Sequence, residues 1–174
     1  MSSVTNPDLA SRRVLLLGAE TDAGRAIASA LSEAGARLAV VGASIGAETA
    51  FAVQRLARTL SAEASQAIDA ANEMAVRVMV RQVSKALGGL DLAVVVLGDT
   101  ATDGQVAALA KRFCSKEMNK RGGGAVAIVW PGTPMLLMPG DSPSATRVTN
   151  LSSAGRALEG VTRDVIAALA APSQ

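Results

Sequence analysis

The sequence RRVLLLGAETDAGRAIASALSEAGARLAVVGAS, residues 12–44, decides the fold that the rest of the chain must follow. It opens with branched apolar residues at 14–17, a run typical of a buried strand and too short for a helix. A turn at Gly18 and a helical pattern follow, and a second apolar run covers 38–41. Strand, glycine turn, helix and strand together predict a βαβ unit with a nucleotide-type turn at its first crossover.

Short apolar runs and helical periodicity alternate along the remaining chain. They predict helices at 47–64, 72–87, 104–121 and 148–170, and strands at 66–68, 92–98 and 125–130. Apolar strands separated by helices indicate a parallel sheet covered on both faces. We expect residues 1–174 to form a single α/β domain, a Rossmann-type doubly wound parallel sheet in a three-layer sandwich. About five strands in the order 3-2-1-4-5 would make up the sheet.

The composition is that of a single compact domain without disulfides. The 174 residues are 49% hydrophobic and 18% charged, and they include one cysteine. We interpret Cys114 as a core thiol in a reducing compartment, because it falls on the apolar face of a predicted helix. The chain has no apolar run long enough to span a membrane, and residues 1–13 lack the apolar core of a signal peptide. We expect a soluble cytoplasmic protein.

The sequence contains no histidine and no tyrosine. This removes the commonest general base, the commonest metal ligand and the phenol that serves as the acid in many hydride-transfer sites. No metal site is expected.

Basic residues are scattered, although the net charge is +2. One predicted helix carries several of them among apolar residues: Lys111, Arg112, Lys116, Lys120 and Arg121. We interpret this as a solvated helix face, and with 2% aromatic residues there is no platform for stacking bases. No nucleic-acid partner is expected.

The order of these landmarks resembles the short-chain dehydrogenase/reductase (SDR) family over almost the whole chain. GGLDLAVVVLG at 88–98 resembles the fourth strand of that family, and KRGGGAVAIVW at 120–130 resembles its fifth. GRALEGVTRDVIAALA at 155–170 is similar to the helix that follows its catalytic lysine.

The family's glycine turn, TGxxxGxG, is altered here. Gly18 and Gly24 match its first and last glycines, but Asp22 replaces the central one. That glycine lets the backbone approach a pyrophosphate, so a carboxylate there brings negative charge towards two phosphates. Either the turn is a weakened cofactor site or it is kept only for the fold, and we favour the second reading.

Other cofactor positions implied by the resemblance are also changed. The end of the second strand has Ala43 and Ser44 in place of an acid or a base for the ribose. Asp69 matches the residue beside the adenine, although it is equally a helix cap for 72–87. The family's NNAG block appears as Val95 to Gly98. We expect no cofactor in this chain, with Gly18, Asp22, Gly24, Asp69 and Gly98 as degenerate remnants.

The catalytic residues that the resemblance implies are absent. The position of the serine falls at Pro131, and the tyrosine and lysine of YxxxK fall at Leu151 and Gly155. Ser152 and Ser153 lack a base that would activate them. The resemblance therefore implies a pseudoenzyme.

The resemblance also implies missing C-terminal parts. We expect the chain to lack the family's sixth strand and substrate-covering lid, which would leave strand 125–130 at an edge of the sheet. We further expect Trp130 and the loop 131–147 to fill the vacated cleft.

In the family, the helices corresponding to 104–121 and 148–170 commonly form a four-helix bundle between subunits. The chain resembles the inactive subunit type of heteromeric 2-(hydroxybenzyl)succinyl-CoA dehydrogenase from anaerobic toluene degradation. We therefore expect a non-catalytic subunit that pairs through these helices with an active paralogue carrying NAD, as a heterotetramer. The alternatives are a dinucleotide-binding sensor without turnover and, least favoured, an enzyme of altered chemistry.

Overall fold

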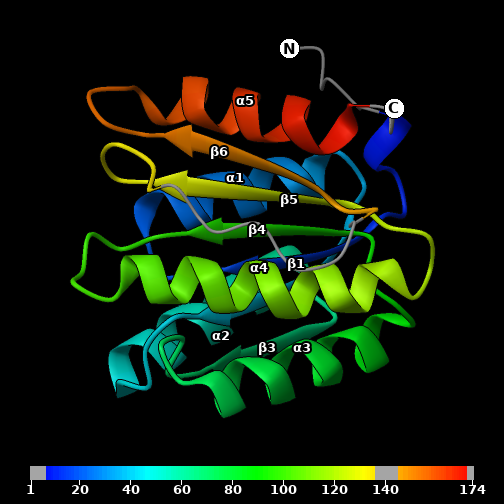
Figure 1. Ribbon diagram of the computed structural model, residues 1–174, viewed down its shortest axis with the longest axis horizontal. Coiled ribbons are helices and arrows are strands. Elements are labelled where there is room, and N and C mark those ends of the chain that lie inside the picture. Colours follow the sequence, from blue (N-terminus) through cyan, green and yellow to red (C-terminus); the bar gives the residue numbers. More distant parts are fainter. Residues whose placement is uncertain (1–6, 136–144, 172–174) are drawn as a thin grey trace.

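The computed structural model describes residues 7–135 and 145–171, which form one six-stranded parallel sheet between two layers of helices (Figure 1). The strand order is β3-β2-β1-β4-β5-β6. After a short 3-10 helix at Pro7–Leu9, the elements are β1 Arg13–Leu17, α1 Asp22–Glu33, β2 Arg37–Gly42, α2 Ala47–Leu60, β3 Ala64–Ala67, α3 Glu73–Leu87, β4 Leu92–Val96, α4 Asp103–Asn119, β5 Ala125–Trp130, β6 Arg147–Ser152 and α5 Leu158–Ala170.

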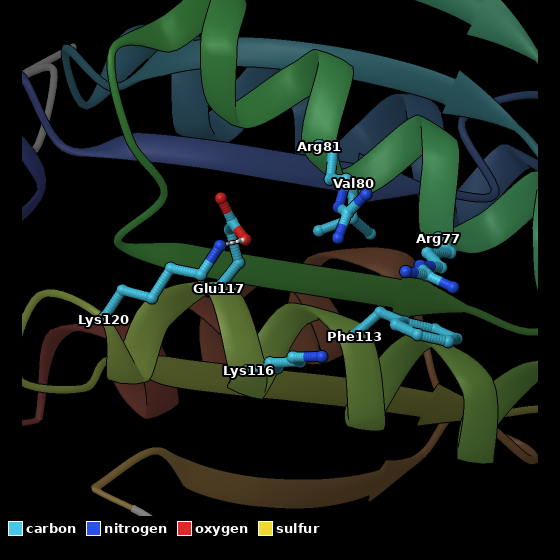
Figure 2. A pocket seen from close by; sticks show the side chains of 7 residues that line it. All are labelled: Arg77, Val80, Arg81, Phe113, Lys116, Glu117 and Lys120. Carbon is cyan, nitrogen blue, oxygen red and sulfur yellow. Dashed lines mark hydrogen bonds and ion pairs between the residues drawn. The ribbon is translucent and has the colours of Figure 1, made fainter.

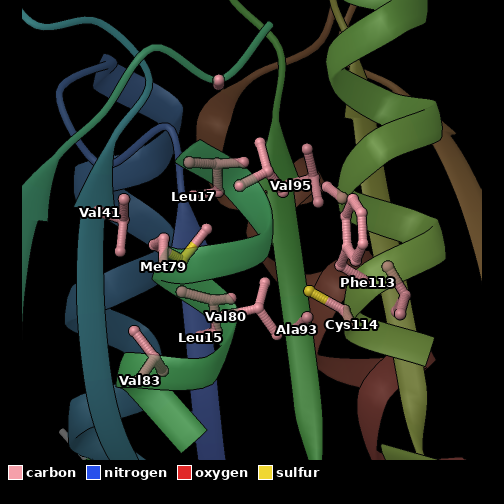
Figure 3. Packing of buried hydrophobic residues seen from close by; sticks show 14 of the residues in the cluster. Leu15, Leu17, Val41, Met79, Val80, Val83, Ala93, Val95, Phe113 and Cys114 are labelled. Atoms are coloured by element: carbon pink, nitrogen blue, oxygen red, sulfur yellow. The ribbon is translucent and has the colours of Figure 1, made fainter. Parts of the chain in front are cut away.

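Two apolar cores lie on opposite faces of the sheet. Leu15 and Leu17 of β1 point to the face covered by α3 and α4, where they pack with Met79 and Phe113 (Figure 3). The alternate residues of the strands pack against α1, α2 and α5 on the other face. Successive side chains of a strand point to opposite faces, and both faces of this sheet are covered by helices. Nearly every residue of β1, β2, β4 and β5 is therefore buried.

The predicted fold class is confirmed, and the sheet has one strand more than expected. Residues 147–152 form β6 and pair in parallel with β5, although the sequence predicts a helix from residue 148. The predicted absence of a sixth strand is therefore wrong. Strand β5 is not an edge strand, and all of its residues are buried. The helix begins only at Leu158, after a turn in which Gly155 has φ 65°.

Helices α4 and α5 lie on opposite faces of the sheet. Helix α4 packs with α3 over one core, whereas Val161, Val165 and Leu169 of α5 belong to the other core together with residues of α1. The predicted contribution of 104–121 and 148–170 to one intersubunit bundle is therefore wrong, because the sheet separates them. Helix α5 therefore lies beside α1, on the face of the sheet opposite to α4.

The described ends of the connection from β5 to β6 contact α4. At its start, the side chain of Met135 lies against Gly104 at the beginning of α4. At its end, the Thr146 hydroxyl donates a hydrogen bond of 2.8 Å to the Asn119 side chain, at the last residue of α4. The described parts of the connection, 131–135 and 145–146, are not helical. Most of the predicted cleft-filling loop, 136–144, lies outside the described residues.

An ion pair joins β1 and β4 at the amino edge of the sheet. Arg13 donates to both carboxylate oxygens of Asp91, at 2.9 and 2.8 Å, and its backbone N–H donates to the same carboxylate at 3.0 Å. Both side chains are about one-fifth exposed. The hydrogen bonds from Arg13 lower the pKa of Asp91 from its ordinary value of 3.8.

We predict that Asp91→Asn lowers the free energy of unfolding by about 1–2 kcal/mol at neutral pH, because charge-assisted hydrogen bonds are lost. The pair stabilises the fold above the ordinary pKa of Asp91, and its contribution is lost as pH falls through the lowered pKa of the folded state. Urea denaturation at neutral pH and at about pH 3 should therefore show the difference between variant and wild type shrinking in acid. Glu63→Gln, which breaks the more exposed Arg37–Glu63 pair, is the control and should cost much less. Equal losses in both variants would contradict the prediction.

Candidate functional site

The glycine turn between β1 and α1 lies at the carboxyl edge of the sheet, where doubly wound folds bind their ligands. Gly18 has φ 92°, and a Cβ built on it would lie 2.2 Å from the carbonyl oxygen of Val96 in β4. A Cβ on Gly24 would lie 2.1 Å from the carbonyl oxygen of Gly18. Both glycines are thus required by close backbone packing within the domain.

The start of α1 is capped by the turn itself. The Thr21 hydroxyl accepts a hydrogen bond of 2.9 Å from the Gly24 N–H and donates one of 2.8 Å to the Gly18 carbonyl. Asp22 is the first residue of α1, and its side chain is 79% exposed and ion-paired with Arg25. The carboxylate therefore lies at the helix N-terminus, the position where dinucleotide-binding folds place a pyrophosphate.

A second carboxylate links the turn after β1 to the end of β2. Both oxygens of Glu20 lie 3.2 Å from the backbone nitrogen of Ala43, which donates to them just after β2. This is the strand end where dinucleotide-binding folds hold the ribose. Sequence reasoning missed Glu20, because nothing in the local sequence shows that the β1–β2 register brings it to Ala43.

The neighbouring strand ends hold the other predicted remnants. The backbone N–H of Ala71 donates to Asp69 at 3.1 Å, in a local turn. Asn72, not Asp69, caps α3, by accepting from Ala75 N–H at 2.9 Å, so the alternative role of Asp69 as helix cap is wrong. At the end of β4, Val95 and Val96 are buried, and Gly98 is exposed.

The predicted catalytic positions do not form a site. Pro131 follows Trp130 at the end of β5, and the Trp130 indole donates to the Asn150 side chain at 2.9 Å. Leu151 lies in β6 and packs into the core of the α5 face. Gly155 lies in the following turn, so the two positions assigned to YxxxK do not share a helix.

The motif is absent in any register, because the sequence has no tyrosine and residues 131–146 contain no lysine.

The single cysteine is confirmed as a core thiol. Cys114 is 1% exposed and lies on the buried side of α4 (Figure 3). Burial raises its pKa to about 12, and the charge of Glu117 adds to the shift. The thiolate that nucleophilic catalysis needs is therefore negligible at neutral pH.

Two hollows lie away from the glycine turn. One, of about 370 Å³, lies against α2 and β3 and is lined in part by Phe51 and Gln66. The other, of about 20 Å³, lies between α3 and α4 and is surrounded by cationic side chains (Figure 2). The described residues contain no group of three or more acidic or cysteine side chains placed to hold a metal ion, and among them no helix is long and apolar enough to cross a membrane.

Known proteins similar to this chain have the same fold. A family model described as "Enoyl-(Acyl carrier protein) reductase" matches residues 18–167. A short-chain type dehydrogenase/reductase from Mycobacterium marinum is 26% identical with TM-score 0.58, over 74% of this chain and 59% of that one. A Mycobacterium ulcerans relative is 22% identical with TM-score 0.60, over 70% and 51%.

A third solved structure, the NADPH-dependent 3-quinuclidinone reductase from Rhodotorula rubra, is 16% identical with TM-score 0.59, over 74% and 55% of the two chains. At their level of identity, the M. ulcerans and R. rubra structures support the fold alone. The chain spans 51 to 59% of the length of the three solved structures. No curated protein matches the sequence.

The family model matches most of the chain and shows the family that the order of the sequence landmarks indicated. The chain belongs to the short-chain dehydrogenase/reductase family.

Proposed function

We propose that this protein is a non-catalytic SDR subunit that associates with an active short-chain dehydrogenase and stabilises it, with NAD bound by the partner. The observation that carries the proposal is the pair of carboxylates at the glycine turn. Glu20 is bound to the backbone at the end of β2, and Asp22 lies at the N-terminus of α1.

The residues of this edge do not fit a dinucleotide. Two carboxylates would face a diphosphate, and charges of like sign at about 4 Å repel by roughly 1–4 kcal/mol, depending on solvation. The Gly24 N–H, which could otherwise donate to a phosphate, is already bound to Thr21. These contacts support the interpretation that the glycine turn is retained for folding and not for binding a cofactor.

The chemistry of reduction is also unsupported. The family's proton donor is a tyrosine, and this sequence has none. Trp130 and Asn150 form a hydrogen bond at the end of β5 and β6, and neither an indole nor an amide can act as general acid near neutral pH. The buried Cys114 offers no alternative nucleophile.

The partner surface that remains is the exposed side of α4. Ala108 is exposed and Ser115 partly exposed, seven positions apart on this helix, so they lie on one face and their small side chains allow a second helix to approach closely. Because α5 lies on the other face of the sheet, it would serve a separate contact.

The experiment is co-expression of the chain with active short-chain dehydrogenases from its own genome, followed by native mass spectrometry and activity assays. We expect a stoichiometric complex, higher thermal stability of the active subunit in that complex, and turnover that depends only on the catalytic residues of the partner. Ala108→Arg should prevent association, whereas Ala52→Arg in α2 should not. If the isolated chain forms a homo-oligomer that binds NAD(P), a sensor function would replace this proposal.

A further inference from the structure

Positive charge is concentrated in the groove between α3 and α4. The hollow of about 20 Å³ is surrounded by Arg77 and Arg81 of α3, Lys116 of α4 and Lys120 at the C-cap of α4, with Glu117 beside them (Figure 2). Counting these five side chains, the rim carries a net charge of +3, whereas the whole chain carries only +2.

Three of the four cations have no ion-pair partner within the described residues. Lys120 forms an ion pair of 2.8 Å with Glu117. Hydrogen bonds and nearby positive charges lower the pKa of Glu117, although its partial burial acts in the opposite direction. Arg77, Arg81 and Lys116 form none with the residues that the structure describes. Clustered cations repel one another, and an anionic partner would remove that cost.

The spacing of the cations suits a helix. Arg77 and Arg81 are four residues apart on α3, and Lys116 of α4 is four residues from Lys120, the C-cap of that helix. Each pair therefore covers about 6 Å along its helix, which is the spacing of carboxylates at positions i and i+4 of another helix. The hollow has room for about one oxygen-sized group, so a row of separate carboxylates fits better than one bulky polyanion.

Exposed apolar side chains next to these cations favour a protein partner. Met74 and Val78 are 62% and 42% exposed. They lie one turn apart on α3, and Met74 is three residues from Arg77, as Val78 is from Arg81. Residues three or four apart are neighbours on a helix surface, so α3 presents an apolar row alongside a basic one.

We propose that the α3–α4 groove is a docking surface for an acidic amphipathic helix of a partner protein. Its carboxylates would bind Arg77, Arg81 and Lys116, and its apolar residues would pack on Met74 and Val78. The groove is separate from the glycine turn, and its argument uses neither Ala108 nor Ser115 of α4, so this inference does not depend on the proposed function.

The test is fluorescence anisotropy with the full chain and a labelled synthetic helix that has glutamates at every fourth position and leucines on the adjacent line. The double variant Arg77→Gln/Arg81→Gln should bind about tenfold more weakly and show a smaller salt dependence. The variant Met74→Ser/Val78→Ser should also weaken binding but keep the salt dependence of wild type. The control Arg55→Gln/Arg58→Gln removes two exposed arginines of α2 and should bind as wild type does.

Thermal midpoints would verify that every variant is folded. Equal binding by wild type and the Arg77/Arg81 variant would overturn the proposal, as would failure of the helix to bind wild type at low salt. A DNA duplex that binds wild type more tightly than the helix would assign the groove to nucleic acid instead. If pyrophosphate displaces the helix at a lower concentration than free glutamate does, the groove would be assigned to a phosphate ligand.

Discussion

Replacing Gly18 with alanine is expected to destabilise the folded protein strongly at room temperature, in the absence of any nucleotide. The new Cβ would lie 2.2 Å from the carbonyl oxygen of Val96, the last residue of β4. Strand β4 is paired on both sides, by β1 and β5, so its backbone cannot move away. The residue would also have to keep φ 92°, which L side chains rarely adopt. We expect a loss of at least about 4 kcal/mol, a large part of the stability of an ordinary domain. Circular dichroism and urea denaturation would measure it.

Two other glycines separate the causes of that effect. Gly88 has φ 78° but open space around its Cβ position, so Gly88→Ala should cost about 1 kcal/mol from backbone strain alone. Gly46 has neither a positive φ nor a neighbour within 4 Å, and Gly46→Ala should cost only a few tenths of a kcal/mol. If Gly18→Ala is no more destabilising than Gly88→Ala, the close contact with β4 is not what preserves this glycine.

Glycines of a family motif can be retained for backbone packing alone. Gly18 and Gly24 match a cofactor-binding pattern, yet the turn needs both of them to bring β1, α1 and β4 together. A glycine retained at such a position says nothing about cofactor binding. The central position of the motif, where Asp22 is exposed, is free of this constraint and therefore reports on the ligand.

The sequence predicted the first βαβ unit well, because local signals agree there. A short apolar run, a turn at Gly18 and a periodic helix all indicate the elements observed at β1, α1 and β2. The same holds for α3, whose predicted range of 72–87 differs from the observed helix by one residue. Parallel pairing of buried strands then fixes most of the topology.

The prediction failed where the chain departs from alternating strands and helices. The sequence predicts no helix between β5 and β6, and its predicted last helix begins at residue 148, so it includes most of the stretch that forms β6. Val148 and Leu151 are three residues apart, a spacing that suits a helix, so the stretch shows no strand alternation even though the two side chains pack on opposite faces of the sheet. Long-range contacts such as Glu20 with Ala43 have no local signal at all, because they depend on the register between two strands.

The double variant Glu20→Ser/Asp22→Gly is expected to gain affinity for NAD⁺ or NADP⁺ by at least about tenfold over wild type. Removing both carboxylates takes away repulsion worth roughly 1 kcal/mol or more each, and 1.4 kcal/mol corresponds to a factor of ten. It also frees the N–H of Ala43 and lets the backbone of α1 approach a phosphate. Isothermal titration calorimetry would compare the variant with wild type, for which we expect no saturable binding at millimolar nucleotide.

A charge-matched control separates local from general electrostatics in this experiment. Glu33→Ser/Glu48→Ser removes two exposed carboxylates from other parts of the same face and should not bind nucleotide. If wild type already binds NAD(P) tightly, the carboxylates do not block the site and the sensor function is correct. If neither variant gains affinity while both stay folded, the obstruction lies at the end of β4, where Val95 and Val96 replace the polar amides of the family. Gain in the turn variant alone would show that two side chains keep an otherwise intact turn from binding its ligand, and that loss of the cofactor needed no change in the fold.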